Sequence, residues 1–173
     1  ILRCLVGSEM CIRDSGIRSC GWTAPCPPAL EPPYPRGTAC PAGTDVQGYI
    51  ALAGAGRYED AYRLIRQSNP FPSVCGRICN HPCQAACNRN DLDESVGIRD
   101  IKRFVADKAF ENGMPVVEKK RKSNGKKIAV IGAGPSGLSC AYYLQLSGYS
   151  VEVFESESVA GGVLAYGIPE YRL

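Results

Sequence analysis

The chain has 173 residues, which is enough for one ordinary domain or two small ones. Hydrophobic residues make up 45% of it, close to the average for globular proteins, so a packed core can form. The net charge of +3 is too small to predict binding to nucleic acid or to an anionic membrane, and no apolar run is long enough to cross a membrane.

The first residues give no helix or strand pattern. Residues 1–15 show no sustained hydrophobic period and resemble translated adapter sequence at the edge of an assembled fragment. Six prolines between residues 16 and 37 oppose both helix formation and strand pairing. We therefore expect residues 1–37 to form a disordered leader that is partly artefactual. Because the chain lacks an initiator methionine and stops within a motif, we expect it to be a fragment.

Three amphipathic helices are predicted in the first half of the chain. Thr44 is a suitable N-cap for the first, whose apolar residues recur at helical spacing over 46–53. The same pattern predicts a second helix around 61–65 and a third over 98–109. We interpret residues 38–115 as one helical domain.

A charged stretch separates this helical domain from the rest. Residues 118–127 are rich in lysine, and such a run is typical of a solvated linker. We predict a linker over 116–126, at the place where a domain boundary is expected.

The hydrophobic pattern changes after the linker. Residues 127–131 are predicted to form a buried strand, residues 138–144 a helix and residues 151–155 a second strand. Strand–helix–strand alternation is typical of parallel α/β folds. We therefore predict that residues 127–173 begin an α/β domain of the Rossmann type and end before it is complete.

A glycine-rich turn connects the first of these strands to the helix. Gly132 permits a tight turn, Gly134 allows the backbone to approach a pyrophosphate, and Gly137 allows the helix to pack closely on the strand. The helix N-terminus adds unpaired N–H groups that suit phosphate. The predicted dinucleotide-binding residues are Gly132, Gly134, Pro135, Ser136, Gly137, Glu155 and Gly162.

An acidic residue at the end of the second strand bears on the choice of dinucleotide. Glu155 can accept hydrogen bonds from ribose hydroxyls, whereas it would repel the 2′-phosphate of NADP. NAD and FAD both fit such a site. The pair Gly161-Gly162 just downstream is typical of two-dinucleotide-binding flavoproteins and favours FAD.

Ten cysteines indicate a metal site. No signal peptide is legible and the dinucleotide motif is typical of cytosolic enzymes, so we expect a cytoplasmic protein with reduced thiols. Three residues separate each of Cys75, Cys79, Cys83 and Cys87 from the next, and Cys40 lies upstream. Thiolates suit iron–sulfur clusters or zinc, and four of them are usual for [4Fe–4S].

The segment that carries these cysteines is predicted to be rich in loops. We expect Gly76 and Pro82 to break any helix over 71–95, so that the chain can wrap around a metal group. A neighbouring dinucleotide site could exchange electrons with a metal group, which favours an iron–sulfur cluster over zinc. The alternative is a zinc-stabilised docking module without redox activity. His81 could ligate a metal, but beside Pro82 we expect it to be a loop residue that caps or forms hydrogen bonds. We expect Cys140 to be a small buried hydrophobe.

Three stretches resemble a known family, that of the small subunit of glutamate synthase and the N-terminal portion of dihydropyrimidine dehydrogenase. They are residues 39–50 (ACPAGTDVQGYI), 69–83 (NPFPSVCGRICNHPC) and 161–173 (GGVLAYGIPEYRL). The resemblance implies a helical iron–sulfur domain followed by an FAD domain with an inserted NADPH domain. It also implies that NADPH reduces FAD and that clusters pass electrons to a partner subunit or C-terminal domain, such as a large subunit of glutamate synthase.

The resemblance also implies roles for particular cysteines. Cys40, Cys79 and Cys83 match ligands of one cluster, Cys87 matches a ligand of the other, and Cys75 matches a cysteine near both.

Two departures from the family concern the number of clusters. Arg36 stands where the family has a cysteine ligand, and Lys102 stands where it often has glutamate or glutamine. A protonated lysine offers no lone pair to a metal. We therefore expect one [4Fe–4S] cluster, held by Cys40, Cys79, Cys83 and either Cys87 or Cys75. We expect no catalytic residue in this part of the parent enzyme, which alone should be inactive because the NADPH site lies outside it.

Overall fold

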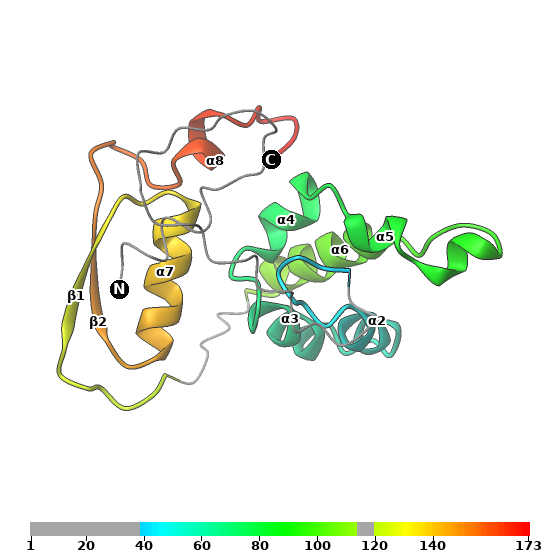
Figure 1. Ribbon diagram of the computed structural model, residues 1–173, viewed down its shortest axis with the longest axis horizontal. Helices are drawn as coiled ribbons and strands as arrows, with labels where there is room; N and C mark the ends of the chain where they lie inside the picture. The colour runs from blue at the N-terminus through cyan, green and yellow to red at the C-terminus, as the bar shows by residue number, and fades with distance from the viewer. Residues whose placement is uncertain (1–38, 114–119) are drawn as a thin grey trace, which may run out of the picture. The chain divides into compact units, whose positions relative to one another are not determined.

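The computed structural model describes residues 39–113 and 120–173. Within these residues a helical part is followed by a strand–helix–strand unit, as the sequence predicts (Figure 1). The predicted leader over 1–37 lies outside the described residues, as does part of the predicted linker over 116–126.

The helical part contains the three predicted helices and three shorter ones. None of the helices among the described residues is long and apolar enough to cross a membrane. In chain order the elements are α2 (Val46–Gly54), α3 (Tyr58–Arg66), α4 (Pro72–Ile78), α5 (Pro82–Ala85), the 3₁₀ helix η1 (Asn88–Asp91) and α6 (Ile98–Glu111).

The N-cap predicted for the first helix is wrong by one residue. Asp45 caps α2, because its Oδ1 accepts a hydrogen bond of 2.9 Å from the backbone N–H of Gly48. A carboxylate at this position also interacts favourably with the helix dipole. Thr44 is buried instead, and its Oγ1 accepts a hydrogen bond of 2.9 Å from the hydroxyl of Ser68 just after α3.

The prediction that Gly76 breaks any helix over 71–95 is also wrong. Gly76 lies inside α4, where a Cβ atom would stand 2.8 Å from the Cα of Arg103 on α6. The missing side chain therefore serves close contact between two helices. The helical path is broken instead at Cys79, which is extended, and at His81, whose φ of 46° is left-handed. A new short helix then begins at Pro82.

A small core joins α2, α3 and α6. Tyr49 of α2 is 1% exposed, and its hydroxyl donates a hydrogen bond of 3.1 Å to the backbone carbonyl of Ile98, the first residue of α6. This bond satisfies a polar group that would otherwise be costly to bury. The buried residues of the core are Val46, Tyr49, Ala61, Ile65, Ile98 and Val105.

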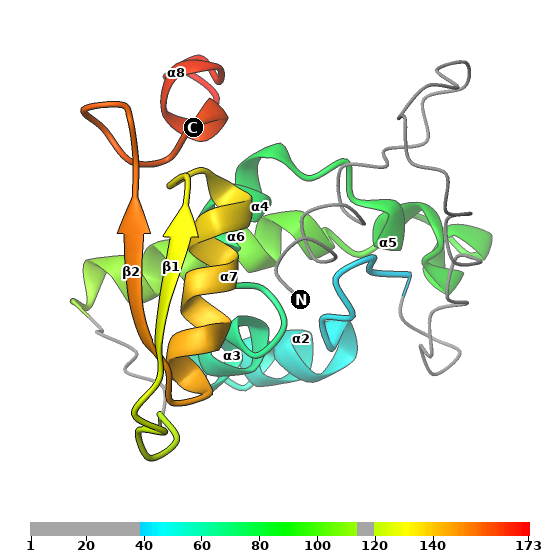
Figure 2. The same cartoon turned by 60° about the vertical axis from the view of Figure 1, so that its left-hand side comes forward.

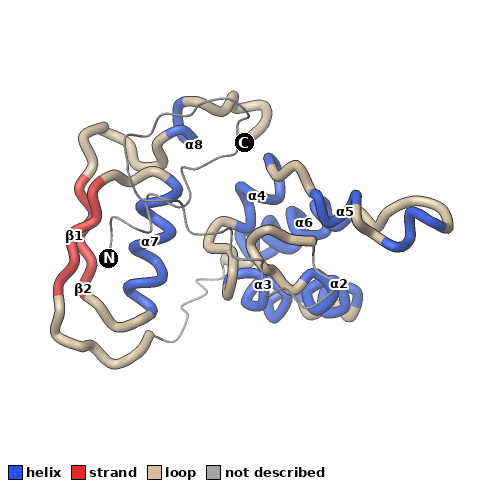
Figure 3. The backbone as a smooth tube through the Cα atoms, viewed as in Figure 1, coloured by secondary structure: helices blue, strands red, loops and turns tan. Residues whose placement is uncertain are grey.

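The second part is one strand–helix–strand unit followed by a short helix. β1 (Lys127–Ile131) and β2 (Ser150–Phe154) are parallel, with Lys127 opposite Ser150 and Ile131 opposite Phe154. They are the strands of the described residues (Figure 3). Figure 2 shows α7 (Pro135–Leu146) lying along the strand pair, as expected for a crossover helix. The helix α8 (Val163–Tyr166) follows.

We predict that Gly76→Ala destabilises the helical part by about 1–3 kcal/mol, because the added methyl group must push α4 away from the backbone of α6. Gly54→Ala is the matched control, since a Cβ on this last residue of α2 would meet no atom within 4 Å. Its unfolding free energy should change by less than about 1 kcal/mol. Denaturant unfolding followed by circular dichroism measures both, and equal stability of the two variants would contradict this interpretation of Gly76.

Candidate functional site

Four of the predicted cysteine ligands are linked by electrostatic interactions. Cys40 and Cys79 both interact electrostatically with Cys75 and with Cys83. The four thiols come from the turn before α2, from α4, from its C-terminal end and from α5. We call Cys40, Cys75, Cys79 and Cys83 the four-cysteine site.

The core supports one side of the four-cysteine site. Cys40 begins a turn in which its carbonyl accepts a hydrogen bond of 2.9 Å from the N–H of Gly43. Cys40 and Cys83 are half-buried and pack against the buried core. Burial raises the pKa of Tyr49, and negative charge on Cys83, Cys40 and Cys79 raises it further. The Tyr49 hydroxyl is therefore within electrostatic range of three of the four thiols.

Cys79 is held at both its sulfur and its carbonyl. The backbone N–H of His81 donates to the Cys79 Sγ atom at 3.3 Å. The Cys79 carbonyl accepts a hydrogen bond of 3.2 Å from the guanidinium of Arg99 on α6, and the His81 Nδ1 atom lies 3.2 Å from the same oxygen. The left-handed backbone of His81 thus turns an N–H group toward a predicted ligand.

Cys75 has a hydrogen-bond partner that sequence reasoning missed. Its thiol donates to the Oδ1 atom of Asn69 at 3.6 Å, and the same oxygen accepts a bond of 3.0 Å from the N–H of Phe71. Asn69 is 6% exposed, so its amide is fixed in place. Burial raises the pKa of Cys75, whereas the charge of Lys102 opposes this rise. Metal binding by Cys75 would replace its bond to Asn69.

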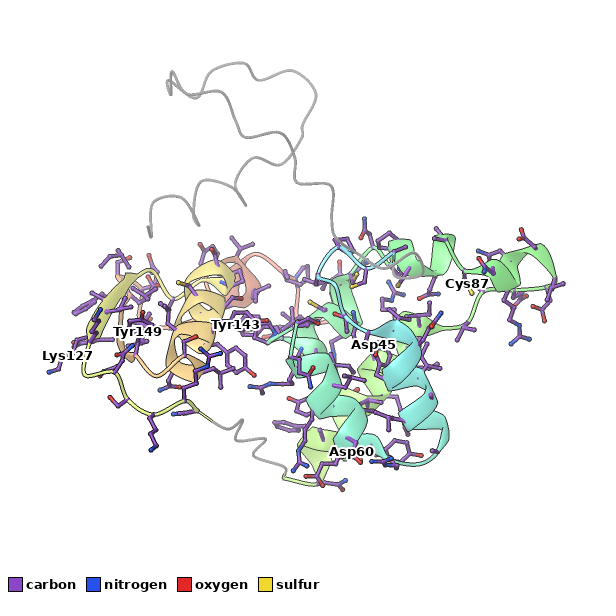
Figure 4. All side chains as sticks on the ribbon, turned by 60° about the horizontal axis from the view of Figure 1, so that its bottom comes forward. Asp45, Asp60, Cys87, Lys127, Tyr143 and Tyr149 are labelled. Atoms are coloured by element: carbon purple, nitrogen blue, oxygen red, sulfur yellow. The ribbon has the colours of Figure 1, made fainter. Side chains whose placement is uncertain are left out.

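Cys87 is not among the groups whose charge chiefly shifts the pKa of Tyr49, Cys75 or Cys83. Figure 4 shows it on the segment after α5. The backbone N–H groups of Val96 and Arg89 lower its pKa, and neither group belongs to the other predicted ligands. Cys75 and Cys87 were the two candidates for a fourth ligand. The charges of Cys79 and Cys40 act on Cys75, and the identity of the fourth ligand stays a prediction. Cys140 is half-buried on α7 in the second part.

The arrangement of the thiols bears on the kind of metal group that they could hold. Among residues 39–113 and 120–173, no three histidine, cysteine or acidic side chains converge closely enough to hold a single ion. A [4Fe–4S] cluster spreads its thiolates over separate iron atoms, so its ligands stand farther apart than those of one ion. Four half-buried neighbouring thiols therefore fit such a cluster in both ligand type and number.

The glycine-rich turn of the second part has the geometry that its sequence predicts. The N–H of Gly132, whose φ is 95°, donates to the Phe154 carbonyl at 2.7 Å and joins the turn to β2. A side chain at Gly137 would collide with the Gly132 carbonyl oxygen, which explains the glycine there. A Cβ at Gly134 would meet no protein atom within 4 Å, so the turn is open at that point.

Unpaired N–H groups surround this open point. The N–H groups of Gly134, Ser136 and Gly137 form no hydrogen bond within the described part of the chain. Pro135, the first residue of α7, has no N–H group to satisfy. Unpaired donors at a helix N-terminus, together with the helix dipole, form a binding site for phosphate.

The downstream glycine pair lies directly on the glycine-rich turn. The N–H of Gly161 donates to the Ala133 carbonyl at 2.8 Å. A Cβ at Gly162, whose φ is 53°, would stand 2.9 Å from the Cα of Gly134. Two glycine segments that are separate in the sequence therefore form one small backbone site.

Glu155 also contacts this turn. Its carboxylate accepts hydrogen bonds from the N–H groups of Ala133 at 2.6 Å, Ser156 at 2.7 Å and Glu157 at 3.1 Å. The bond from Glu157, followed by those from Ala133 and Ser156, lowers the pKa of Glu155. The carboxylate therefore holds the glycine-rich turn in place. It is also the group predicted to accept hydrogen bonds from a ribose. The sequence contains no signal for this bond to Ala133.

Two protein families match successive parts of the chain. Residues 32–114 match the family described as dihydropyrimidine dehydrogenase domain II, 4Fe-4S cluster. Residues 130–168 match the family described as NAD(P)-binding Rossmann-like domain. The first match spans the four-cysteine site, and the second spans the glycine-rich turn and Glu155.

Curated proteins similar to this chain are subunits of oxidoreductases. The NADPH-Fe(3+) oxidoreductase subunit beta of Geobacter sulfurreducens is 44% identical over 77% of this chain and 20% of its own length. For the NADP(+)-dependent formate dehydrogenase subunit beta of Moorella thermoacetica, the identity is 44% over 78% of this chain and 22% of the relative.

The glutamate synthase [NADPH] small chain of Bacillus subtilis is 39% identical over 78% of this chain and 30% of its own length. The chain thus spans less than a third of each of these three relatives. Their names agree with the resemblance drawn from the motifs. Residues 32–114 thus match the 4Fe-4S family of dihydropyrimidine dehydrogenase domain II, residues 130–168 match the NAD(P)-binding Rossmann-like family, and the chain is similar to part of oxidoreductase subunits such as the glutamate synthase small chain.

Proposed function

We propose that this chain is the electron-transfer part of an NADPH-linked flavoprotein, in which electrons pass from FAD through one [4Fe–4S] cluster to a partner subunit or domain. The observation that carries this proposal is the gathering of four half-buried thiols in a domain of a 4Fe-4S family. When bound, FAD would accept a hydride and pass on single electrons, and the cluster would hold one electron at a time.

Cys40, Cys75, Cys79 and Cys83 would hold the cluster. The N–H of His81 is already directed at the Cys79 sulfur. Hydrogen bonds to ligand sulfurs and partial exclusion of solvent are also what sets the potential of such a cluster. The core beneath Cys40 and Cys83 keeps these thiols in place before a cluster binds.

The glycine-rich turn would hold the pyrophosphate of the dinucleotide. The unpaired N–H groups of Gly134, Ser136 and Gly137 would donate to phosphate oxygens, and Glu155 would accept from the ribose. A 2′-phosphate would be repelled by the Glu155 carboxylate. The contact of Gly162 with Gly134 adds the second glycine segment expected of flavoproteins, so we propose FAD at this site.

The whole reaction would require more protein than this chain. Hydride transfer needs the nicotinamide of NADPH held against the flavin ring at near-contact distance. The named relatives are subunits of NADPH-linked or NADP-linked enzymes and are more than three times as long as the matched region. We therefore assign NADPH oxidation and the final electron acceptor to the longer protein and its partner.

We predict that Cys79→Ser or Cys83→Ser abolishes cluster binding, because each removes a thiolate that serine replaces poorly as a ligand to iron. Cys140→Ser should retain the cluster of the parent chain, since Cys140 lies on α7, outside the four-cysteine site. Iron and sulfide are measured in the three variants after anaerobic reconstitution. Equal iron content in Cys79→Ser and in the parent would refute the ligand assignment.

A second prediction separates binding of the dinucleotide from folding. Gly134→Ala should leave the melting temperature unchanged, because its Cβ would meet no protein atom within 4 Å and the φ of −73° suits alanine. It should weaken FAD binding about tenfold or more, which is about 1.4 kcal/mol, because the methyl group enters the space proposed for the pyrophosphate.

Flavin fluorescence titration measures this affinity, and Gly54→Ala is again the control. Binding of FAD by Gly134→Ala with the affinity of the parent would contradict the proposed phosphate site. Tighter binding of NADP than of FAD by the parent would contradict the choice of dinucleotide.

A further inference from the structure

Lys102 lies on the side of α6 that contacts the cysteine-bearing segments. One turn before it, the guanidinium of Arg99 donates to the Cys79 carbonyl at 3.2 Å, and the backbone N–H of Arg99 donates to the Gln84 side chain at 3.0 Å. The residue after Lys102 is Arg103, whose backbone adjoins Gly76 of α4. Both flanking contacts therefore bring this stretch of α6 against the segments that carry Cys75, Cys79 and Cys83.

The charge of Lys102 is not neutralised by a carboxylate within the described residues. Two other cations of α6 have acidic partners: Arg103 lies 3.6 Å from Asp107, and Lys108 lies 2.8 Å from Glu111. Arg99 instead donates to the Cys79 carbonyl. Lys102 is half-buried and forms no ion pair with an acidic side chain of residues 39–113 or 120–173. Its positive charge opposes the rise in pKa that burial causes at Cys75 and Cys83.

We propose that Lys102 is the counter-cation of the cluster in the four-cysteine site, where its ammonium group offsets the negative charge of the cluster and raises its reduction potential. This inference rests on the proposed function. A [4Fe–4S] cluster with four thiolates is anionic and gains one more negative charge on reduction. A fixed cation nearby stabilises the reduced form more than the oxidised form, so the electron is held more tightly.

Partial burial strengthens this effect. Charges that are fully exposed are screened by water and salt, whereas half-buried groups interact through a medium of lower dielectric constant. A lysine cannot ligate iron while it is protonated, so its contribution at this position is charge rather than a bond. Lys102 is thus a positioning and tuning residue for electron transfer and not a ligand.

The test compares three variants of the anaerobically reconstituted chain. Lys102→Met removes the charge and keeps most of the volume, and Lys102→Arg keeps the charge. Lys108→Met removes a charge from the same helix at a position paired with Glu111, and it is the matched control. The readout is the midpoint potential of the cluster, from a redox titration followed by electron paramagnetic resonance.

Lys102→Met should lower the equilibrium constant for one-electron reduction of the cluster about tenfold, which lowers the midpoint potential by about 59 mV. Lys102→Arg and Lys108→Met should keep the parent potential. Loss of the cluster from Lys102→Met but not from Lys102→Arg would also support a charge role. A parent potential in Lys102→Met, or the same loss in both Lys102 variants, would overturn the inference. Absence of a cluster from the parent would instead refute the proposed function itself.

Discussion

The contact between α4 and the backbone of α6 at Gly76 determines where the cysteine side chains lie. A Cβ at Gly76 would stand 2.8 Å from the Cα of Arg103, so only glycine allows this approach without a shift. Once α4 lies there, Cys75 and Cys79 stand beside α6, and Arg99 can donate to the Cys79 carbonyl. Tyr49 fixes the start of α6 through its bond to the Ile98 carbonyl. The core and the four-cysteine site therefore depend on the same helix.

The charges around the four-cysteine site follow from that arrangement. Four half-buried thiols would be costly to ionise together without compensation, and burial raises the pKa of both Cys75 and Cys83. The compensation in this chain comes from the N–H of His81 and from the cationic side of α6. In the second part, unpaired N–H groups lie at a glycine-rich turn that suits phosphate. The carboxylate of Glu155 holds this turn by accepting a hydrogen bond from Ala133.

Much of this architecture could be predicted from local sequence patterns. Periodicity predicted α2, α3 and α6, and the glycine spacing predicted the strand–helix–strand unit. The short helix α4 could not be predicted, because a helix of this length depends on tertiary packing against α6 rather than on its own propensity. The bonds from Cys75 to Asn69 and from Ala133 to Glu155 join residues through the fold and leave no periodic signal. Sequence alone also left either Cys75 or Cys87 as the fourth ligand, because ligand choice depends on how the fold brings the thiols together.

Binding of one [4Fe–4S] cluster by the four-cysteine site is the central proposal for this chain. The most direct measurement is the metal content of the chain purified without oxygen, together with its electron paramagnetic resonance spectrum after reduction with dithionite. We predict four iron and four sulfide ions per chain and a signal from a single reduced cluster. A colourless protein with one zinc ion per chain and no such signal would contradict the account and would favour a docking module without redox activity.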